Sequence, residues 1–412
     1  MNKRRFFNFV KFFSIIIILF LSGCNNSLPS SSTSVTDISS DTVSFISEPE
    51  TASYEETTEE TTEETTPEYV PVTVDLIMVG DILAHEGVYN SGIYPDGTYN
   101  YDHIFANVTE DIQAADLALV NQEVVLGGVE LGLSGYPCFN SPVELGDALV
   151  NAGFNVILHA TNHALDKGSI GVENTLDFWN TSYPDLPILG IHNSQEDYDN
   201  NNVYIYTKED LRIAILNYTY GTNGIPLPAD KPYLVNLLDR DKIASDIEYA
   251  QENADFVIVC PHWGTEYVYE PDYSQKEWTT FFLEQGVDLV IGTHPHVIEP
   301  VEWVTDDNGN EMLVYYSLGN FVSNQDQAPR MLGAMAKVTI TKDEEDVYIS
   351  DYSVEPLVTH KLFGLGLITT YKLSDYTEEL AAQNAINRDV SGFSLEYLKN
   401  LCRQVFGELY EE

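Results

Sequence analysis

Positively charged residues are scarce in this chain, and their scarcity excludes several kinds of partner. Lysine and arginine together number 19 among 412 residues, against 65 aspartates and glutamates, so the formal net charge is −46. A nucleic-acid duplex and an anionic membrane surface both attract basic proteins. We therefore expect no nucleic-acid partner, and no binding to a membrane surface by charge.

Cysteine is also rare, and the four cysteines match the spacing of no zinc knuckle or redox motif. Cys260 lies within an apolar run, where packing in the core is the expected role. A disulfide between Cys138 and Cys402 is an alternative that the sequence leaves open.

Long apolar runs are lacking except near the N-terminus, where a basic start precedes FFSIIIILFL and then Leu21-Ser22-Gly23-Cys24. This order is typical of a secretory signal, and the last four residues resemble the lipobox of bacterial lipoproteins. We predict a signal peptide over 1–24, lipidation of Cys24 and an extracytoplasmic, membrane-anchored lipoprotein. An uncleaved transmembrane anchor is the alternative, although the run is short for a membrane span.

Residues 25–70 have low complexity and include the acidic repeat EETTEETTEETTPE. Such a segment buries too little apolar surface to offset its chain entropy, so we predict a disordered tether. A glycosylated stalk is the other interpretation of its serine and threonine content.

The rest of the chain alternates strand-like and helix-like segments, which predicts an α/β domain over 71–358. Helices are expected at 142–152, 170–180, 239–253 and 274–286, with antiparallel strands after His296. Residues 359–412 are expected to form a helical extension that either packs on the domain or serves as an interaction arm.

Metal-ligand side chains follow five apolar runs of the kind that form buried strands. The run VDLIMVG precedes Asp81, ADLALVNQ precedes Glu123, and NVILHAT precedes Asn162 and His163. The run ADFVIVCP precedes His262, and VDLVIGT precedes His294 and His296. The carboxyl ends of neighbouring parallel strands share one edge of a sheet. If these strands lie side by side, the carboxylates, amide and imidazoles converge as a binuclear metal centre requires.

The motifs occur in the order Gly80-Asp81, Asn121-Gln122-Glu123, Asn162-His163, His262-Trp263-Gly264, Gly292-Thr293-His294-Pro295-His296 and Tyr316-Ser317-Leu318-Gly319-Asn320. Over about 73–325 the chain resembles the CapA family of capsule or poly-γ-glutamate synthesis proteins, a branch of the calcineurin-like metallophosphoesterases. The resemblance implies a four-layer αββα sandwich with two facing mixed sheets. It also implies two divalent ions, drawn from manganese, iron and zinc.

The resemblance assigns roles to individual residues. Asp81 and His296 would bind one ion, Glu123 would bridge both, and Asn162, His262 and His294 would hold the second. His163 would protonate a leaving group, and Asp166, three residues later, would orient its imidazole.

Two departures from the superfamily pattern lie within these motifs. The first motif usually reads Asp-x-His, whereas the next histidine here is His85, which is a candidate ligand. The bridging position carries glutamate instead of aspartate, which changes its reach. Glu266 and Asn320 are candidate substrate contacts, with bracing of their loops as the alternative role.

The leading hypothesis is a metal-dependent hydrolase or transferase that acts on an anionic polymer such as poly-γ-glutamate. It would work in synthesis, export or anchoring of that polymer, beside membrane subunits of a polymer synthase. A non-catalytic metal-binding scaffold of such a synthase and a secreted phosphoesterase are the alternatives.

Overall fold

The computed structural model describes residues 69–362 and 366–410 of the chain. The predicted signal peptide, Cys24 and almost all of the predicted tether lie outside the described residues. Within the described part, no helix is both long enough and apolar enough to cross a membrane.

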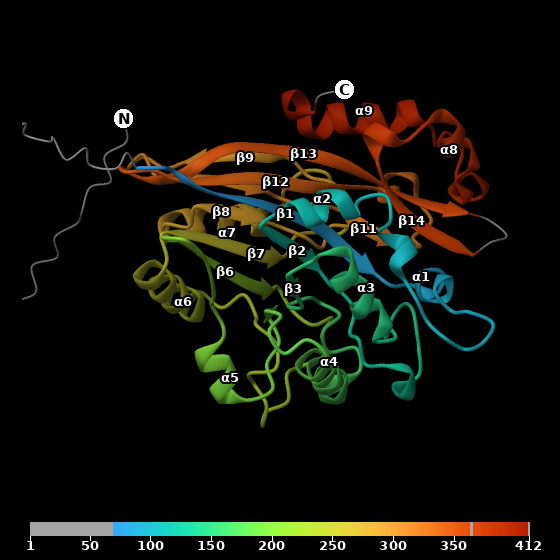
Figure 1. Cartoon of the computed structure of the whole chain (residues 1–412), viewed down its shortest axis with the longest axis horizontal. Coiled ribbons are helices and arrows are strands. Elements are labelled where there is room, and N and C mark those ends of the chain that lie inside the picture. Colours follow the sequence, from blue (N-terminus) through green and yellow to red (C-terminus); the bar gives the residue numbers. More distant parts are fainter. Residues whose placement is uncertain (1–68, 363–365, 411–412) are drawn as a thin grey trace, which may run out of the picture. The chain divides into compact units, whose positions relative to one another are not determined.

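Two β-sheets organise the domain (Figure 1). The larger sheet has the order β14-β13-β12-β1-β2-β3-β4, with β11 pairing to β1. Its strands are β1 (Val72–Leu83), β2 (Leu117–Asn121), β3 (Val156–Leu158), β4 (Ile188–Leu189), β11 (Asn320–Ser323), β12 (Leu332–Lys342), β13 (Val347–Leu362) and β14 (Leu367–Lys372). Strands β1 to β4 run parallel, whereas β12, β13 and β14 are antiparallel to their neighbours. The sheet is therefore mixed.

The smaller sheet has the order β5-β6-β7-β8-β10-β9 and is also mixed. Its strands are β5 (Tyr204–Lys208), β6 (Leu211–Thr219), β7 (Phe256–His262), β8 (Leu289–Ile291), β9 (Val301–Thr305) and β10 (Glu311–Tyr315). Strands β6, β7, β8 and β10 are parallel, and β5 and β9 close the two edges as antiparallel strands.

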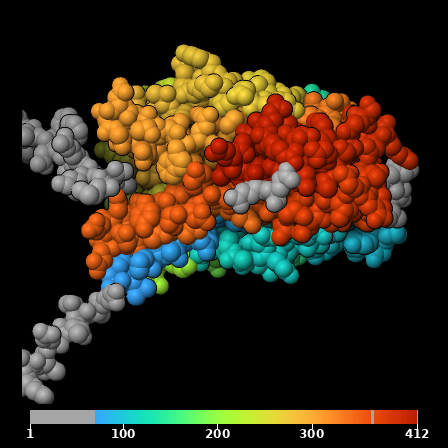
Figure 2. Space-filling view, turned by 90° about the horizontal axis from the view of Figure 1, so that it is seen from above, coloured from blue at the N-terminus to red at the C-terminus, as the bar shows by residue number. Residues whose placement is uncertain are grey.

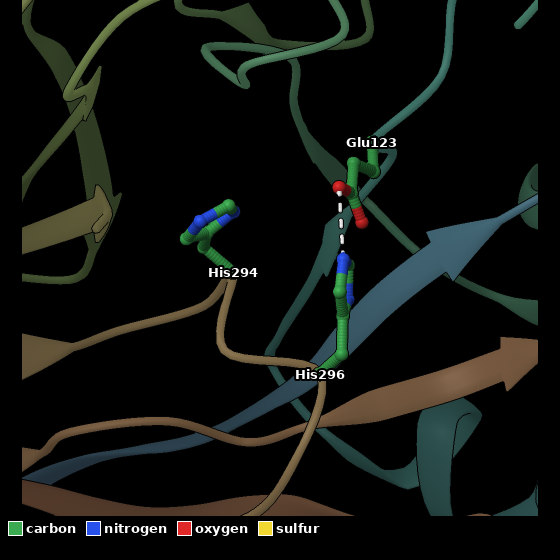
Figure 3. A group of neighbouring side chains, drawn as sticks. All are labelled: Glu123, His294 and His296. Atoms are coloured by element: carbon green, nitrogen blue, oxygen red, sulfur yellow. Dashed lines mark ion pairs between the residues drawn. The ribbon is translucent and has the colours of Figure 1, made fainter. Parts of the chain in front are cut away.

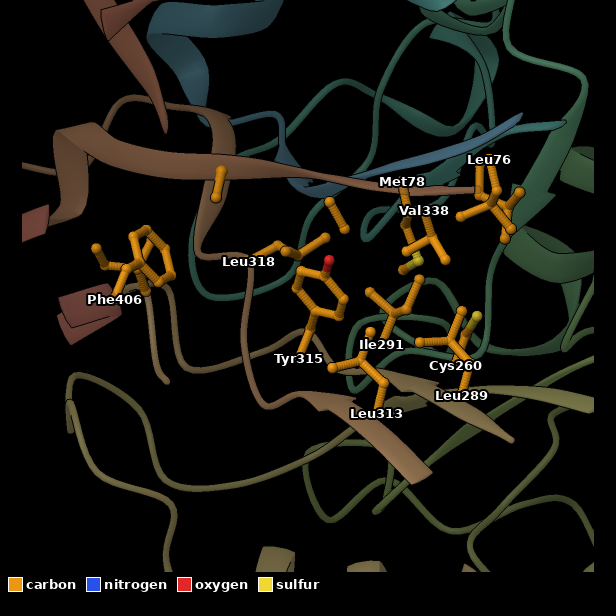
Figure 4. Packing of buried hydrophobic residues seen from close by; sticks show 14 of the residues in the cluster. Leu76, Met78, Cys260, Leu289, Ile291, Leu313, Tyr315, Leu318, Val338 and Phe406 are labelled. Carbon is orange, nitrogen blue, oxygen red and sulfur yellow. The ribbon is translucent and has the colours of Figure 1, made fainter. Parts of the chain in front are cut away.

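Alternate residues of the central strands enter two different cores, because successive side chains of a strand point to opposite faces. In β1, Leu76 and Met78 enter the core between the sheets, whereas Ile77 and Val79 face the helices outside. Figure 4 shows the inter-sheet core, where Met78 and Val338 of the larger sheet meet residues such as Leu289 of the smaller one. Burial on both faces explains why these strands are apolar at nearly every position.

Helices cover the outer face of each sheet. On the larger sheet these are α2 (Thr109–Ala114), α3 (Glu144–Ala152) and α4 (Gly168–Ser182), and on the smaller sheet α6 (Arg240–Asn253) and α7 (Tyr273–Glu284). Short helices α1 (Glu86–Ser91) and α5 (Gln195–Asn200) lie in the connections. The predicted αββα sandwich with two facing mixed sheets is confirmed, as are the four predicted helices, whose ends move by one to a few residues.

The C-terminal segment packs onto the sandwich and is not a free arm. It contains α8 (Glu378–Gln383) and α9 (Leu395–Phe406), which Figure 2 shows in red beside the orange strands. Leu398, Cys402 and Phe406 belong to the same core cluster as the inter-sheet residues. The predicted start of the extension at residue 359 falls inside β13, and the sheet continues through β14 before the helices begin.

The five motif-bearing strands do not form one continuous row. β1, β2 and β3 are neighbours in the larger sheet, and β7 and β8 are neighbours in the smaller one. The three described cysteines are free, with Cys138 exposed and Cys260 and Cys402 buried. The disulfide considered between Cys138 and Cys402 is therefore not formed, and Cys260 packs in the core as expected.

Candidate metal centre

Each sheet delivers polar side chains to the end of its parallel strands. Asp81 lies near the end of β1, Glu123 follows β2 by two residues, and His262 is the last residue of β7. Each of these three residues has a relative exposure of 1% or less. Buried carboxylates and imidazoles at strand ends are costly unless partners satisfy them, so their convergence points to a bound ligand.

The loop after β8 carries His294 and His296 in an uncommon backbone conformation. Their φ angles are +106° and +59°, in the left-handed region that residues with a Cβ seldom adopt. The loop is braced by Asn320, whose Nδ2 donates to the His296 carbonyl at 3.3 Å, and by the Tyr267 N–H, which donates to the Pro295 carbonyl at 2.8 Å. Strain of this kind persists at functional sites because the surrounding structure enforces it.

Glu123 stands at the middle of the cluster. Its Oε1 atom lies 3.7 Å from His296 Nε2 and 3.8 Å from His262 Nε2. Neither carboxylate oxygen of Glu123 has a hydrogen-bond partner among the described residues. Figure 3 shows its carboxylate facing His296, with His294 on the same loop. One ligand atom from each of Glu123, His294 and His296 lies within 4.8 Å of the other two, close enough for a cation to lie among them.

The remaining donors form two groups, one on each side of Glu123. On one side His296 Nδ1 lies 3.0 Å from Asp81 Oδ2. On the other side His262 Nε2 lies 2.9 Å from Asn162 Oδ1 and 3.2 Å from His294 Nδ1. This division is the one implied by the resemblance, with Glu123 between a site containing Asp81 and a site containing Asn162.

The electrostatics of the cluster favour cation binding. Burial, together with neighbouring histidines, holds the pKa values of His262 and His294 well below the usual value of 6.5. Their imidazoles are therefore neutral near pH 7 and keep the lone pair that a metal ion needs. Burial and the negative charge of Asp81 hold the pKa of Glu123 well above 4.5. Burial thus favours the neutral carboxyl group, and a divalent ion would favour the carboxylate instead.

His163 lies beside the cluster in the turn that follows β3. Its Nδ1 atom is 2.7 Å from Asp166 Oδ2, which also accepts the Phe139 backbone N–H at 2.6 Å. The ring of Phe139 meets the His163 ring edge-on at 4.6 Å. The expected contact of His163 with Asp166 is present, so Nε2 is the ring atom left for proton transfer.

Three other predicted residues lie around the centre in different roles. His85 directs Nδ1 to the Leu83 carbonyl at 3.1 Å and packs edge-on against Phe139, and burial lowers its pKa to about 4. Glu266 is exposed on the loop after β7. Asn320 braces the His296 loop and leaves its Oδ1 without a partner among the described residues. Ligation by His85 and substrate contact by Glu266 and Asn320 stay predictions.

Several residues that orient these groups were given no role from the sequence, although Asn121 and Thr293 lie within its motifs. Asn121 Nδ2 donates to Asp81 Oδ1 at 2.8 Å, and Thr293 Oγ1 lies 3.1 Å from His262 Nδ1. Asn223 Oδ1 accepts from Asn162 Nδ2 at 3.2 Å, and its own Nδ2 lies 3.2 Å from His163 Nδ1. Asn223-Gly224 can be recognised as a turn, but its approach to His163 depends on the tertiary fold.

The donor set fits divalent metal ions. It combines two carboxylates, one amide oxygen and three imidazoles, a mixture suited to manganese, iron or zinc. The two oxygens of buried Glu123, which have no partner among the described residues, are the clearest sign that the cluster suits a cation, because buried polar atoms are otherwise nearly always satisfied.

Known proteins resemble this chain in sequence and in fold. Residues 75–325 match the family described as bacterial capsule synthesis protein PGA_cap. The PGA biosynthesis protein CapA of Bacillus subtilis (strain 168) is 32% identical over 187 residues, which are 43% of this chain and 44% of that protein. The capsule biosynthesis protein CapA of Bacillus anthracis is 27% identical over 263 residues, 61% of this chain and 60% of that protein.

The chain thus spans about half the length of these curated relatives. Among solved structures, the calcineurin-like phosphoesterase YfkN of Bacillus subtilis is 12% identical, with a TM-score of 0.38. That likeness covers 81% of this chain and 97% of the solved one.

Proposed function

The chain belongs to the bacterial capsule synthesis protein family, and from that premise we propose that it is a binuclear metal-dependent hydrolase or transferase acting on an anionic capsular polymer. We further propose that Cys24 anchors it by lipid outside the cytoplasm. Poly-γ-glutamate is the favoured polymer, because both curated relatives are named for PGA or capsule biosynthesis. Membrane subunits of a polymer synthase are the proposed partners.

One observation carries the proposal. Glu123 is buried, both of its oxygens lack partners among the described residues, and Oε1 stands between His296 and His262. A carboxylate with two free oxygens between two groups of donors suits a bridge between two cations. Asp81 and His296 would hold one ion, and Asn162, His262 and His294 the other.

The chain's own residues would divide the work of the reaction. Two bound divalent ions supply an activated water and neutralise negative charge on the reacting group. His163 would give a proton to the leaving atom from Nε2, since Nδ1 faces Asp166. Asn121 and Thr293 would hold Asp81 and His262 in position.

Metal content tests the centre directly. The full chain should carry about two transition-metal ions when purified and measured by elemental mass spectrometry. His294→Ala should carry fewer, whereas His103→Ala, which changes a histidine outside the centre, should match the parent. Full metal content in a variant with both Glu123→Ala and His294→Ala would contradict the assignment of ligands.

Turnover separates an enzyme from a scaffold. The parent should shorten or transfer poly-γ-glutamate, measured as a change in chain length by gel filtration. His163→Ala should keep its metal and lose that activity. A parent with bound metal that changes neither the polymer nor a phosphomonoester would be a metal-binding scaffold, and action on the phosphomonoester alone would make it a phosphoesterase.

A further inference from the structure

Lys361 is a buried cation close to the candidate metal centre, and the carboxylates of Asp326 and Asp389 act on it only from beyond ion-pair distance. It lies in β13 with a relative exposure of 7%, and its Nζ donates to the Gln325 carbonyl at 2.6 Å. No carboxylate among the described residues forms an ion pair with it. A lysine is almost never buried unless it is paired, because desolvating an ammonium group is costly. An anion that is not part of the folded chain would supply the close ion pair that Lys361 lacks among the described residues.

Gln325 links Lys361 to the loop that carries His296. Its Oε1 accepts from Asn320 Nδ2 at 3.0 Å, and its Nε2 lies 3.3 Å from the Tyr267 hydroxyl. Asn320 Nδ2 also donates to the His296 carbonyl at 3.3 Å. The ammonium group therefore binds the main chain of the residue whose side chain reaches both the His296 loop and the Tyr267 hydroxyl.

A second cation lies at the other end of this link. The guanidinium carbon of Arg330 stands 3.5 Å from the centroid of the Tyr267 ring, and that ring centroid is 6.0 Å from the ring of His296. The carbonyl of Arg330 accepts from Asn320 Nδ2 at 3.1 Å, which ties its backbone to the same loop. Within the described part of the chain, its guanidinium forms one long ion pair, at 3.9 Å, with the exposed Asp326.

Tyr267 is held in this position at an energetic cost. Its φ angle is +66°, and its backbone N–H is fixed by the Pro295 carbonyl, between the two candidate histidine ligands. A bulky residue in the left-handed region is unusual, which favours a functional reason for placing this ring beside His296. The carboxylate of exposed Glu266 accepts from the Tyr267 hydroxyl, which lies 3.3 Å from Gln325 Nε2.

We propose that Lys361 and Arg330, whose guanidinium packs on the Tyr267 ring, form a subsite for an oxyanion of the substrate, adjacent to the group that reacts at the candidate metal centre. The subsite rests on the proposed function and adds the chemical class of its substrate, a carboxylate or phosphate next to the reacting bond. An ammonium and a planar guanidinium bind oxyanions through charge-assisted hydrogen bonds. They would also offset the repulsion of a polyanion by the acidic surface.

Binding of two anionic probes tests the subsite. The full chain, supplied with manganese, is titrated calorimetrically with a short oligomer of γ-linked glutamate and separately with p-nitrophenyl phosphate. Lys361→Met and Arg330→Gln should each weaken binding about tenfold, the effect of losing roughly one charge-assisted hydrogen bond. Lys276→Met, which removes an exposed lysine on the outer helix α7, should bind as the parent does. If the variants bind only the oligomer more weakly, the subsite binds a carboxylate. If they bind only the phosphoester more weakly, the subsite binds a phosphate.

The metal content of every variant is measured as well, so that failure of the subsite can be told apart from failure of the metal centre. Weaker binding at unchanged metal content supports the subsite. A parent that binds metal but binds neither probe, or whose affinity is the same in both variants, overturns the subsite and leaves the centre intact. Loss of metal together with affinity would make Lys361 a support of the centre and overturn the subsite. If Lys361→Met fails to fold, the partly exposed Arg330 decides the question.

Discussion

Glu299 gives the domain a pH-dependent stability that can be measured without knowing the substrate. The side chain is 1% exposed, its Oε2 accepts from Gln275 Nε2 at 2.6 Å, and its Oε1 has no hydrogen-bond partner among the described residues. Burial raises the pKa of Glu299 from 4.5 to about 8. Gln275 in turn completes the capping box of α7 and packs beside Gly264, on the loop that leads to Glu266.

The direction of the effect follows from proton binding. Between pH 4.5 and about pH 8 the folded chain keeps the proton of Glu299, whereas the unfolded chain has lost it. The contribution of Glu299 to the free energy of unfolding is therefore most favourable below pH 4.5, and it becomes less favourable as pH rises towards 8. Each pH unit within this interval is worth about 1.4 kcal/mol, so we expect a loss of about 3–4 kcal/mol between about pH 5 and about pH 8.

Glu299→Gln removes the titration and keeps an oxygen for the Gln275 amide. Urea unfolding of the parent and the variant at both pH values should show the variant gaining about 3–4 kcal/mol relative to the parent as pH rises. Glu302→Gln, at an exposed position three residues later, should follow the parent. If the free energy of unfolding changes equally with pH in the parent and in Glu299→Gln, Glu299 does not carry the proposed pH dependence.

Three further predictions concern the core, the cysteines and the histidine beside the centre. Leu398→Ala should lower the free energy of unfolding by about 2–5 kcal/mol, since Leu398 is fully buried, whereas Lys399→Ala should change it little in the same urea titration. In the native protein a thiol reagent should modify exposed Cys138 before Cys260 and Cys402, which burial protects, and peptide mass spectrometry that finds all three modified together would contradict the fold. Asp166→Asn should lower kcat about 10–100-fold without changing metal content, because His163 loses the negatively charged acceptor that orients its ring, and unchanged kcat would remove His163 from the proposed mechanism.

The central strands were predictable because their environment leaves a direct mark on the sequence. A strand such as β1 or β7 is buried on both faces, so its residues are apolar at almost every position. The edge strand β9 is largely exposed and carries no such run, which is why it could not be recognised individually. The division of the motif-bearing strands between two sheets depends on long-range pairing, which strand-end motifs do not encode.

The candidate ligands were predictable as a set, whereas their supports were not. His294 and His296 come from one loop and Asp81 from a distant strand, but each follows an apolar run that indicates its place. Gln325 and Asn223 lie in ordinary loop sequence, and they matter only because folding brings them to Asn320 and His163. Lys361 lies within a strand, and nothing in its sequence neighbours indicates its burial beside the centre.

The pairing of β1 has a consequence for the order in which the chain can fold as it is synthesised. One edge of β1 receives β2 soon after it emerges, but the other edge waits for β12, and Asp75 and Thr339 at this pairing are 264 residues apart. Until β12 arrives, the first strand presents a row of unpaired backbone groups to any other chain nearby. A nascent or prematurely terminated product is therefore the form most exposed to misassembly, and a helper protein that shields this edge would act until residues 332–342 have been made.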